Sequence, residues 1–354
     1  MSSPSSLHDL AQRVCDWQRQ HGRHHLPWQG TQDPYRVWLS EIMLQQTQVS
    51  TVIPYYERFL ERFPTIHSLA QATQEEVMPY WAGLGYYARA RNLHRCAQVV
   101  AREHGGRFPK SAEEIATLPG IGRSTAAAIA AFCYGERSPI MDGNVKRVFT
   151  RYFGIHGYPG LRAVEQRLWA LAEMAVEQAS GSLDMAAYTQ GLMDLGAQVC
   201  TRSKPLCETC PLASDCEARL RGLQDQLPER RPKRVLPERH CTMLLLHRDG
   251  HLLLEKQPQT GIWGGLWSLP RYDTLEEMAA DCQARGIVMN DDGRMATIVH
   301  TFTHFRLHIA PWLLEAPPNV GETRPMEAWV AFDHLAQTAT PAPVRALLDA
   351  LPVS

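Results

Sequence analysis

The most informative stretch for the fold lies near the middle of the chain and reads Cys200-Thr201-Arg202-Ser203-Lys204-Pro205-Leu206-Cys207-Glu208-Thr209-Cys210-Pro211-Leu212-Ala213-Ser214-Asp215-Cys216. Its four cysteines have the spacing C-x6-C-x2-C-x5-C, and helical sequence lies on both sides. Four thiolates in one turn-rich loop can bind either Zn²⁺ or a [4Fe–4S] cluster. The unequal gaps and the single C-x2-C pair favour the cluster, and a structural zinc site is the alternative.

Composition narrows the class of protein. The other five of the nine cysteines are scattered, which argues against a disulfide framework. A chain of 354 residues with 44% hydrophobic residues predicts about two domains with sizeable cores. Residues 1–6 lack the features of a signal peptide, and no apolar run is long enough to cross a bilayer. We therefore expect a cytoplasmic protein without membrane contact. The net charge of −1 means that any basic surface for nucleic acid must be local.

Hydrophobic periodicity divides the chain into three parts. Residues 1–218 predict an almost entirely helical domain that ends with the cysteine loop over 200–216. Residues 219–237 are rich in arginine and proline and predict an extended basic linker. Residues 238–354 alternate strand-like and helical segments and predict an α+β domain.

Several boundaries follow from local signals. Asp33-Pro34 predicts an N-cap with proline at the first helical position, and a start like a capping box is expected at Ser6 and Asp9. Helices are also expected over 111–118 and 184–199, and one strand-like run over 298–310. The further helices are expected near 51–63, 73–82, 88–104, 124–134, 144–153, 163–178, 274–285 and 342–351.

A glycine-containing turn joins two of the predicted helices. Leu118-Pro119-Gly120-Ile121-Gly122 precedes a helix of small residues that begins at Arg123 or Ser124. Two glycines allow the backbone to approach a phosphate at a helix N-terminus, which favours a hairpin that binds the DNA backbone. A helical hairpin with a glycine C-cap is the alternative.

A second group of polar residues follows this hairpin. Asp142 is expected to cap the next helix, and Lys146 and Arg147 add cations one turn later. We expect these two cations, with Gly120 and Gly122, to contact DNA.

The order helical hairpin, aspartate, four-cysteine loop resembles the DNA glycosylases of the endonuclease III superfamily, which share a helix-hairpin-helix fold. Within it the chain most resembles the MutY family of adenine glycosylases over essentially its full length. Two stretches are especially specific, Trp38-Leu39-Ser40-Glu41-Ile42-Met43-Leu44-Gln45-Gln46-Thr47-Gln48 and Gly83-Leu84-Gly85-Tyr86-Tyr87-Ala88-Arg89-Ala90-Arg91-Asn92-Leu93. The resemblance implies a [4Fe–4S] cluster at Cys200, Cys207, Cys210 and Cys216. It also implies removal of adenine mispaired with 8-oxoguanine or guanine in double-stranded DNA, by a monomer.

Two carboxylates fit this chemistry. Breaking an N-glycosidic bond places negative charge on the leaving base and positive charge on the sugar, so carboxyl groups in different protonation states serve both needs. Glu41 borders an apolar stripe, where desolvation favours its protonated form. The resemblance implies that Glu41 protonates adenine, that Asp142 stabilises the sugar, and that Asn144 positions Asp142 or the water. A solvated helix glutamate is the alternative for Glu41 taken alone.

Ser124 bears on the subclass. Relatives that also cleave the DNA strand have a lysine at this position of the hairpin, whose amine forms a Schiff base with the sugar. Serine cannot form one, so we expect a monofunctional enzyme with water as the acceptor. The catalytic set is therefore expected to contain Glu41, Asp142, Asn144 and Ser124.

Further site residues follow only from the resemblance. It implies an adenine pocket formed by Leu26, Trp28, Gln190 and Met193. It also implies that Gln46, Leu84 and Tyr86 enter or wedge open the duplex. Core packing is the alternative for the aromatic residues among these.

The C-terminal domain resembles the Nudix fold, with its best marker at Gly261-Ile262-Trp263-Gly264-Gly265-Leu266. The glutamate-rich box that holds Mg²⁺ in Nudix hydrolases is missing, since only Glu276 and Glu277 stand in the region. We therefore expect this domain to recognise and not to hydrolyse. The resemblance implies that Phe302-Thr303-His304 contacts 8-oxoguanine, with threonine in place of the usual serine.

Two other functions were compared with adenine excision. A glycosylase/lyase for oxidised pyrimidines is disfavoured by Ser124 and by the Nudix-like domain. A non-enzymatic iron–sulfur DNA-binding or redox-sensing protein is disfavoured because both Glu41 and Asp142 are present.

Overall fold

The computed structural model describes residues 4–232, 235–258, 260–318, 320 and 323–351. They form two compact units, one of residues 1–71 with 92–232 and the other of residues 72–91 with 233–354. Among the described residues, no helix combines the length and the apolar character needed to cross a membrane.

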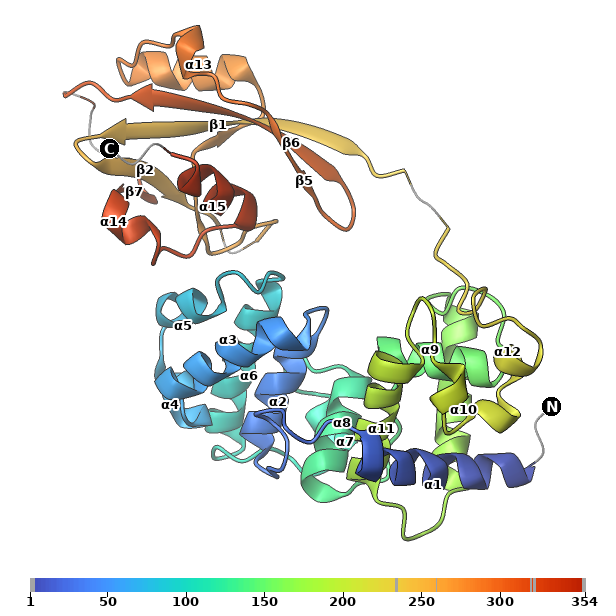
Figure 1. The fold of residues 1–354 in the computed structure, drawn as a ribbon. Coiled ribbons are helices and arrows are strands. Elements are labelled where there is room, and N and C mark those ends of the chain that lie inside the picture. Colours follow the sequence, from blue (N-terminus) through green and yellow to red (C-terminus); the bar gives the residue numbers. More distant parts are fainter. Residues whose placement is uncertain (1–3, 233–234, 259, 319, 321–322, 352–354) are drawn as a thin grey trace. The chain divides into compact units, whose positions relative to one another are not determined.

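The first unit is helical, as the sequence predicts (Figure 1). Its elements are α1 (Pro4–His21), α2 (Pro34–Leu44), α3 (Val49–Arg62), α4 (Ile66–Gln71), most of α6 (Ala88–Glu103), α7 (Ala112–Ile115), α8 (Arg123–Tyr134), α9 (Gly143–Tyr152), α10 (Arg162–Glu177), α11 (Met185–Asp194), the π-helical turn η1 (Leu195–Val199), the 3-10 turns η2 (Cys207–Thr209) and η3 (Ala213–Asp215), and α12 (Glu217–Leu220).

Predicted caps explain where key helices begin. Asp33 accepts a hydrogen bond from the Tyr35 N–H at 3.0 Å, with Pro34 in the first turn of α2, as expected. Asp142 caps α9 in the same manner, accepting from the Val145 N–H at 2.7 Å. Both caps place a carboxylate at the positive end of a helix dipole.

The core of this unit lies among α1, α8, α9, α10 and α11, and three cysteines of the loop, Cys200, Cys210 and Cys216, pack against it. The residues of α8 between Ala126 and Ala131 are fully or almost fully buried. Because five of these six are alanines, α2 packs closely against α8. This packing brings the helix of Glu41 towards the segment that leads to Asp142.

Three boundaries differ from the sequence-based expectation. Helix α1 begins at Pro4, so Ser6 lies inside the helix and does not begin it. The helix expected over 111–118 is only the turn Ala112–Ile115, because the chain bends before Pro119. The helix expected over 184–199 widens into a π-helical turn after Asp194. There Gly196 packs on α9, and a Cβ at Gly196 would lie 2.5 Å from the Asn144 Cβ.

The second unit combines residues 72–91 with the C-terminal domain. It contains α5 (Gln74–Trp81), the first turn of α6, β1 (Glu238–Arg248), β2 (His251–Lys256), β3 (Trp267–Ser268), β4 (Arg271–Tyr272), α13 (Leu275–Ala284), the 3-10 turn η4 (Asp291–Gly293), β5 (Ile298–Thr301), β6 (Arg306–Glu315), β7 (Glu327–Ala331), α14 (Phe332–Leu335) and α15 (Ala342–Asp349). The sequence-based domain boundaries did not anticipate that residues 72–91 pack with the C-terminal domain.

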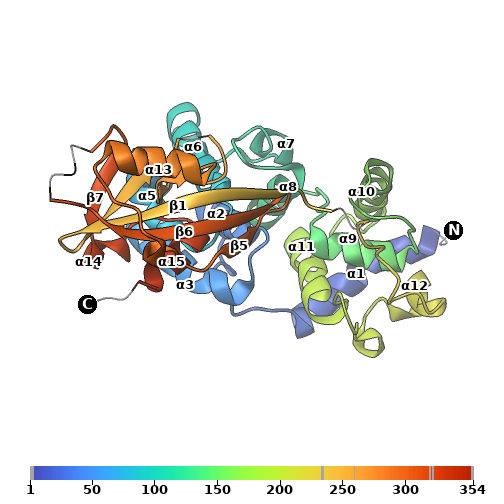
Figure 2. The same cartoon turned by 90° about the horizontal axis from the view of Figure 1, so that it is seen from above.

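The C-terminal domain is built on a mixed sheet in the order β3-β2-β1-β6-β5, with β4 paired to β1 and β7 to β2. Strands β1 and β6 are parallel from the Glu238–Arg306 pair to the His247–Glu315 pair, and they run side by side in both views (Figures 1 and 2). Helix α13 covers one face of the sheet, where Met278 and Cys282 pack with Leu244 and Leu246.

One strand prediction was wrong. The run expected over 298–310 is a hairpin, because the chain turns between β5 and β6 and pairs Thr301 with Arg306. Phe302, Thr303 and His304 therefore lie in the hairpin loop and not along a strand.

The hairpin before α8 gives a stability prediction. Gly120 has φ of +76°, and a Cβ there would lie 2.6 Å from the Asn92 Cβ, whereas Gly122 has φ of −89° and open space around a Cβ. Gly120→Ala should lower the free energy of unfolding by about 1–3 kcal/mol, because it adds both strain and a clash. Gly122→Ala should change it by less than about 0.5 kcal/mol. Denaturant unfolding of the two variants measures the difference, and equal effects would contradict the account.

Candidate active site

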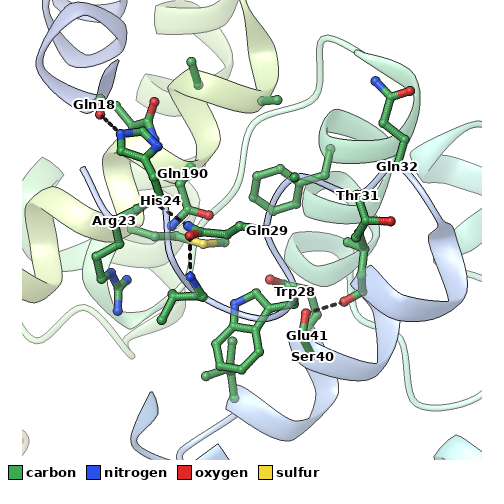
Figure 3. Close-up of a pocket in the computed structure, with 18 of the residues that line it drawn as sticks. Gln18, Arg23, His24, Trp28, Gln29, Thr31, Gln32, Ser40, Glu41 and Gln190 are labelled. Atoms are coloured by element: carbon green, nitrogen blue, oxygen red, sulfur yellow. Dashed lines mark hydrogen bonds between the residues drawn. The ribbon is translucent and has the colours of Figure 1, made fainter. Parts of the chain in front are cut away.

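A cavity of about 700 Å³ opens between the loop before α2 and helix α11. All four residues expected to form the adenine pocket line it, and Glu41 lines it as well (Figure 3). Leu26 and Trp28 are 6% and 8% exposed, and the Trp28 ring also packs edge-on against Tyr56 at 5.4 Å. The structure therefore brings the expected pocket residues together, although Trp28 packs in the core as well.

Glu41 projects from α2 into this cavity. Burial and, to a lesser degree, the negative charge of Asp142 raise the pKa of the Glu41 carboxyl to about 8. A carboxyl group with this pKa is mainly protonated at neutral pH, so Glu41 can donate a proton.

Asp142 is buried at the N-terminus of α9. Its carboxylate accepts hydrogen bonds from the Val145 N–H at 2.7 Å and from the Asn144 side-chain amide at 3.2 Å. Burial raises the pKa of Asp142, while these hydrogen bonds and the Arg147 charge oppose the rise. Hydrogen bonds to the ionised form therefore lower the pKa of Asp142, whereas the Glu41 carboxyl is subject to burial and to the negative charge of Asp142.

Ser124 lies beside this aspartate. Its hydroxyl oxygen accepts a hydrogen bond from the Met141 N–H at 2.9 Å. The serine thus fixes the backbone immediately before Asp142, which ties the start of α8 to the start of α9.

The two expected DNA-binding cations are engaged within the protein. Lys146 forms an ion pair with Glu165 at 2.6 Å. Arg147 donates to the Cys200 carbonyl at 2.6 Å, to the Asn144 side chain at 2.8 Å and to the Gly196 carbonyl. The Arg147 guanidinium thus joins α9 to the π-helical turn and the cysteine loop, and its contact with DNA stays a prediction.

Sequence analysis missed Asp194, which is fully buried beside the pocket. It accepts a hydrogen bond from the Gln190 side-chain amide at 2.8 Å and pairs with the Arg23 guanidinium at 2.7 Å. The hydrogen bond to Asp194 therefore directs the Gln190 amide nitrogen away from any bound base. The side-chain carbonyl oxygen of Gln190 is left for the cavity. The i, i+4 spacing of Gln190 and Asp194 was the available signal.

His24 lines the same cavity. Its Nε2 lies 3.0 Å from the Gln18 carbonyl oxygen (Figure 3). Because a carbonyl oxygen only accepts, Nε2 carries the hydrogen in this contact.

The four loop cysteines line one small apolar cavity of about 30 Å³. Among the residues that the structure describes, no three Cys, His, Asp or Glu side chains converge as a single metal ion would require. A zinc ion needs all four sulfurs about 2.3 Å from one point, whereas the cysteines of a cluster bind separate irons. The buried Arg151 guanidinium donates to the Cys200 sulfur at 3.3 Å, which suits a thiolate ligand. The set of four cysteine sulfurs around one cavity suits an iron–sulfur cluster.

The hairpin before α8 has an open helix N-terminus. Gly122 is the N-cap and makes no side-chain capping hydrogen bond. The first amides of α8 are consequently accessible to an external acceptor such as a phosphate.

Two of the three residues expected to enter the duplex are exposed. Gln46 and Tyr86 have positive φ of 58° and 49°, which is uncommon for residues with a side chain. Tyr86 is 50% exposed, whereas Leu84 is 5% exposed and packs within the protein. The contact of Leu84 with DNA stays a prediction.

The hairpin of β5 and β6, called the recognition hairpin because the family resemblance predicts that its loop contacts 8-oxoguanine, carries an aromatic cluster. Phe302 stacks on Phe305 at 4.5 Å and also packs against Trp263 at 5.9 Å. His304 lies beside Phe305 at 4.7 Å, and the Thr303 hydroxyl is 3.3 Å from the His304 ring.

Two acidic residues of this domain are paired with arginines. Asp281 and Glu327 pair with Arg285, and Arg324 also pairs with Asp281. Glu277 accepts from the Asp273 N–H at 2.9 Å near the start of α13. Within the described part of the domain, these carboxylates stabilise the fold instead of forming a metal site.

Comparisons with known proteins agree with this geometry. Residues 39–174 match the HhH-GPD superfamily of base excision DNA repair proteins, residues 200–216 match the iron–sulfur binding domain of endonuclease III, and residues 241–350 match the NUDIX domain. The adenine DNA glycosylase of Buchnera aphidicola subsp. Acyrthosiphon pisum (strain APS) is 35% identical over 342 residues, which cover 96% of this chain and 97% of that one. The chain belongs to the adenine DNA glycosylases.

The chain is also similar to a human enzyme and to two solved structures. The adenine DNA glycosylase of Homo sapiens is 34% identical, over 86% of this chain and 66% of its own. A solved thermostable thymine-DNA glycosylase is 29% identical, with a TM-score of 0.55 over 61% of this chain and 98% of its own. An endonuclease III–DNA complex is 20% identical, with a TM-score of 0.52 over 63% of this chain and 99% of its own, and supports the fold alone.

Membership settles the class of reaction and the cofactor. The enzyme is a glycosidase of base excision repair, with a helical glycosylase domain followed by a NUDIX-like domain. The resident cofactor is a [4Fe–4S] cluster, and the match to the iron–sulfur binding domain spans residues 200–216, which contain the four loop cysteines. DNA is its partner.

The buried ion pair of Asp194 with Arg23, beside the adenine pocket, gives a second prediction. Asp194→Ala should lower the free energy of unfolding by about 3–5 kcal/mol, because it leaves the Arg23 charge and the Gln190 amide without their buried acceptor. Asp16→Ala is the matched control, since Asp16 pairs with Arg19 in an exposed ion pair worth about 0–1 kcal/mol. Denaturant unfolding measures both, and a small effect for Asp194→Ala would show that the pair does not stabilise this wall of the pocket.

Proposed function

We propose that this enzyme hydrolyses the N-glycosidic bond of adenine mispaired with 8-oxoguanine or guanine, with Glu41 as general acid and Asp142 as the stabilising carboxylate. The observation that carries the proposal is the placement of Glu41. Its carboxyl group lines a cavity large enough for a purine, and burial with the Asp142 charge raises its pKa to about 8.

The two carboxyl groups divide the reaction between them. The protonated Glu41 donates its proton to the purine ring of adenine at N7, so that the base leaves as a neutral molecule with the electron pair of the broken bond. The ionised Asp142 stabilises the positive charge that develops on the sugar. Water then adds to the anomeric carbon, and its proton passes to a carboxylate. Asn144 supports Asp142 in this role by donating to it at 3.2 Å.

The reaction stops at base removal. Ser124 has no amine with which to form a Schiff base, and its hydroxyl is engaged by the Met141 N–H. The Lys146 amine is held in an ion pair with Glu165. These contacts support a monofunctional glycosylase and disfavour a glycosylase/lyase.

Recognition of the mispair is divided between the two units. The open N-terminus of α8 suits a DNA phosphate, and the exposed Gln46 and Tyr86 suit insertion into the duplex from which adenine is extruded. The Phe302-Thr303-His304 loop presents aromatic surface, a hydroxyl and an imidazole to the opposite base. We further propose that the enzyme acts as a monomer in the cytoplasm.

The carboxyl pair predicts the pH dependence of excision. A general acid acts in its protonated form, so the single-turnover rate should fall as pH rises through about 8, where Glu41 loses its proton. On the acid side, the rate should rise as Asp142 ionises, at a pH above the ordinary range of an aspartate because burial raises its pKa. A rate that is constant from about pH 7 to 10 on an 8-oxoguanine:A duplex would remove Glu41 from this role.

A substitution tests the acid directly. Glu41→Gln keeps the shape of the side chain but cannot donate the proton, so single-turnover excision should fall by about 10² to 10⁴ while duplex binding is retained. Glu177→Gln, at the exposed end of α10, serves as control and should leave both unchanged. Excision by Glu41→Gln within tenfold of the unsubstituted enzyme contradicts the assignment.

The loop of residues 302–304 is proposed as the lesion reader, the part of the enzyme that recognises 8-oxoguanine. This role can be tested in the full-length chain. Phe302→Ala with His304→Ala should lower the ratio of excision rates for 8-oxoguanine:A over G:A by about tenfold, because contacts to a base edge discriminate by about 1–3 kcal/mol. Val299→Ala removes an exposed apolar side chain from β5 and should leave the ratio unchanged. An unchanged ratio in the double variant means that the loop is not the lesion reader.

A further inference from the structure

Residues 82–87 form a loop between α5 and α6 whose backbone is held in an unusual shape. Gly83, Gly85 and Tyr86 have positive φ of 101°, 71° and 49°. The first two are glycines, for which this region is accessible, whereas Tyr86 reaches it against the preference of a residue with a Cβ. We call residues 82–87 the wedge loop, because it carries the exposed Tyr86.

Side chains on both sides of the loop stabilise this shape. The Arg89 guanidinium donates to the Leu84 carbonyl at 3.1 Å and to the Gly85 carbonyl at 3.3 Å. The Trp81 indole N–H donates to the Gly85 carbonyl at 3.2 Å. Arg89 also lies over the Trp81 and Tyr86 rings at 5.3 and 5.5 Å. The wedge loop is thus preorganised before any DNA is bound.

The C-terminal domain contacts the wedge loop directly. The Tyr87 hydroxyl donates to the Thr340 carbonyl at 3.2 Å and lies 3.5 Å from the Gly83 N–H. Thr340 is 4% exposed and lies just before α15. One hydroxyl group therefore joins the start of the wedge loop to the C-terminal domain.

A second contact with the C-terminal domain comes from α6, just beyond the loop. The Arg91 guanidinium, in the first turn of α6, donates to the Gly264 carbonyl at 2.8 Å. Gly264 follows Trp263, which is 7% exposed and packs against Phe302 of the recognition hairpin at 5.9 Å. An ion pair between Glu75 of α5 and Lys256 of β2, at 3.6 Å, lies in the same interface.

These contacts form a continuous path from the recognition hairpin to the wedge loop. Phe302 contacts Trp263, and the adjoining Gly264 carbonyl accepts from Arg91 in the first turn of α6. Tyr87, directly after Tyr86, contacts both Thr340 of the C-terminal domain and Gly83 of the wedge loop. We propose that Tyr87 and Arg91 are positioning residues through which the C-terminal domain sets the wedge loop, so that engagement of the lesion base and insertion of Tyr86 are coupled. The proposal rests on the proposed function of the recognition hairpin.

The proposed coupling predicts different effects on excision from the two substrates, the 8-oxoguanine:A and G:A duplexes. A duplex with 8-oxoguanine engages the hairpin more fully than one with guanine, so only the first gains from the link. Loss of the link should therefore slow excision opposite 8-oxoguanine more than excision opposite guanine. Simple loss of packing between the loop and the domain would instead slow both to the same extent.

The experiment uses full-length Tyr87→Phe, which removes one hydroxyl, and Arg91→Met, which removes the donors and keeps an apolar stem. Single-turnover excision from 8-oxoguanine:A and G:A duplexes gives the rate ratio. A 2-aminopurine next to the target adenine reports opening of the stack. Each variant should lower the ratio about three- to tenfold, the size of one lost hydrogen bond. Stack opening should slow mainly with the 8-oxoguanine duplex. Arg91→Lys, which keeps one donor, should restore part of the ratio.

Tyr134→Phe is the matched control, because its hydroxyl also donates to a carbonyl, that of Phe108 at 3.4 Å, away from the wedge loop. It should leave the ratio and the stack opening unchanged. A double-mutant cycle with Phe302→Ala tests the coupling itself, and the combined effect should be smaller than the product of the two single effects.

The outcomes separate this proposal from the one on which it rests. If Phe302→Ala lowers the ratio but Tyr87→Phe and Arg91→Met slow both substrates equally, or combine with Phe302→Ala as independent factors, the coupling is refuted and the lesion reader stands. If Phe302→Ala leaves the ratio unchanged, the lesion reader itself is wrong and the coupling falls with it.

Discussion

The site depends on one capped helix N-terminus, where Asp142 receives the Val145 N–H at 2.7 Å. The same hydrogen bond starts α9, holds the carboxylate still and favours its ionised form. Hydrogen bonds of three neighbouring residues also hold the start of α9 in place. Ser124 holds the preceding amide, Asn144 donates to the carboxylate, and Arg147 connects Asn144 to the carbonyl of Cys200. The cysteine loop therefore contributes to the geometry of the carboxylate through hydrogen bonds and not through contact with it.

The surroundings of the Glu41 carboxyl group differ from those of Asp142. Glu41 lines a cavity instead of capping a helix, and burial and the Asp142 charge raise its pKa to about 8. Burial thus raises the pKa of both carboxyl groups, but hydrogen bonds to the ionised form oppose the rise at Asp142, while the Asp142 charge adds to it at Glu41. The alanine-rich α8 makes the arrangement possible, because its small side chains let α2 pack closely against it.

Much of this arrangement was predictable from the sequence, since short-range signals determine it. The caps at Asp33 and Asp142 were evident from residue type and position, and the pocket residues followed from the family resemblance. The inward direction of Arg147 was not predictable, because its partner Cys200 lies 53 positions away along the chain. The packing of residues 72–91 with the C-terminal domain was missed for the same reason. The turn at residues 302–305 was missed because its sequence is as strand-like as its flanks.

The central claim is that Glu41 is protonated at neutral pH beside an ionised Asp142. Its most direct test is a carbon-13 NMR titration of the enzyme labelled at the glutamate side-chain carboxyl carbons, with Glu41→Gln used to assign the signal. One carboxyl resonance, absent from Glu41→Gln, should titrate with a midpoint near pH 8, while ordinary glutamates titrate near 4. A Glu41 signal that is already that of a carboxylate at pH 6 would contradict the account.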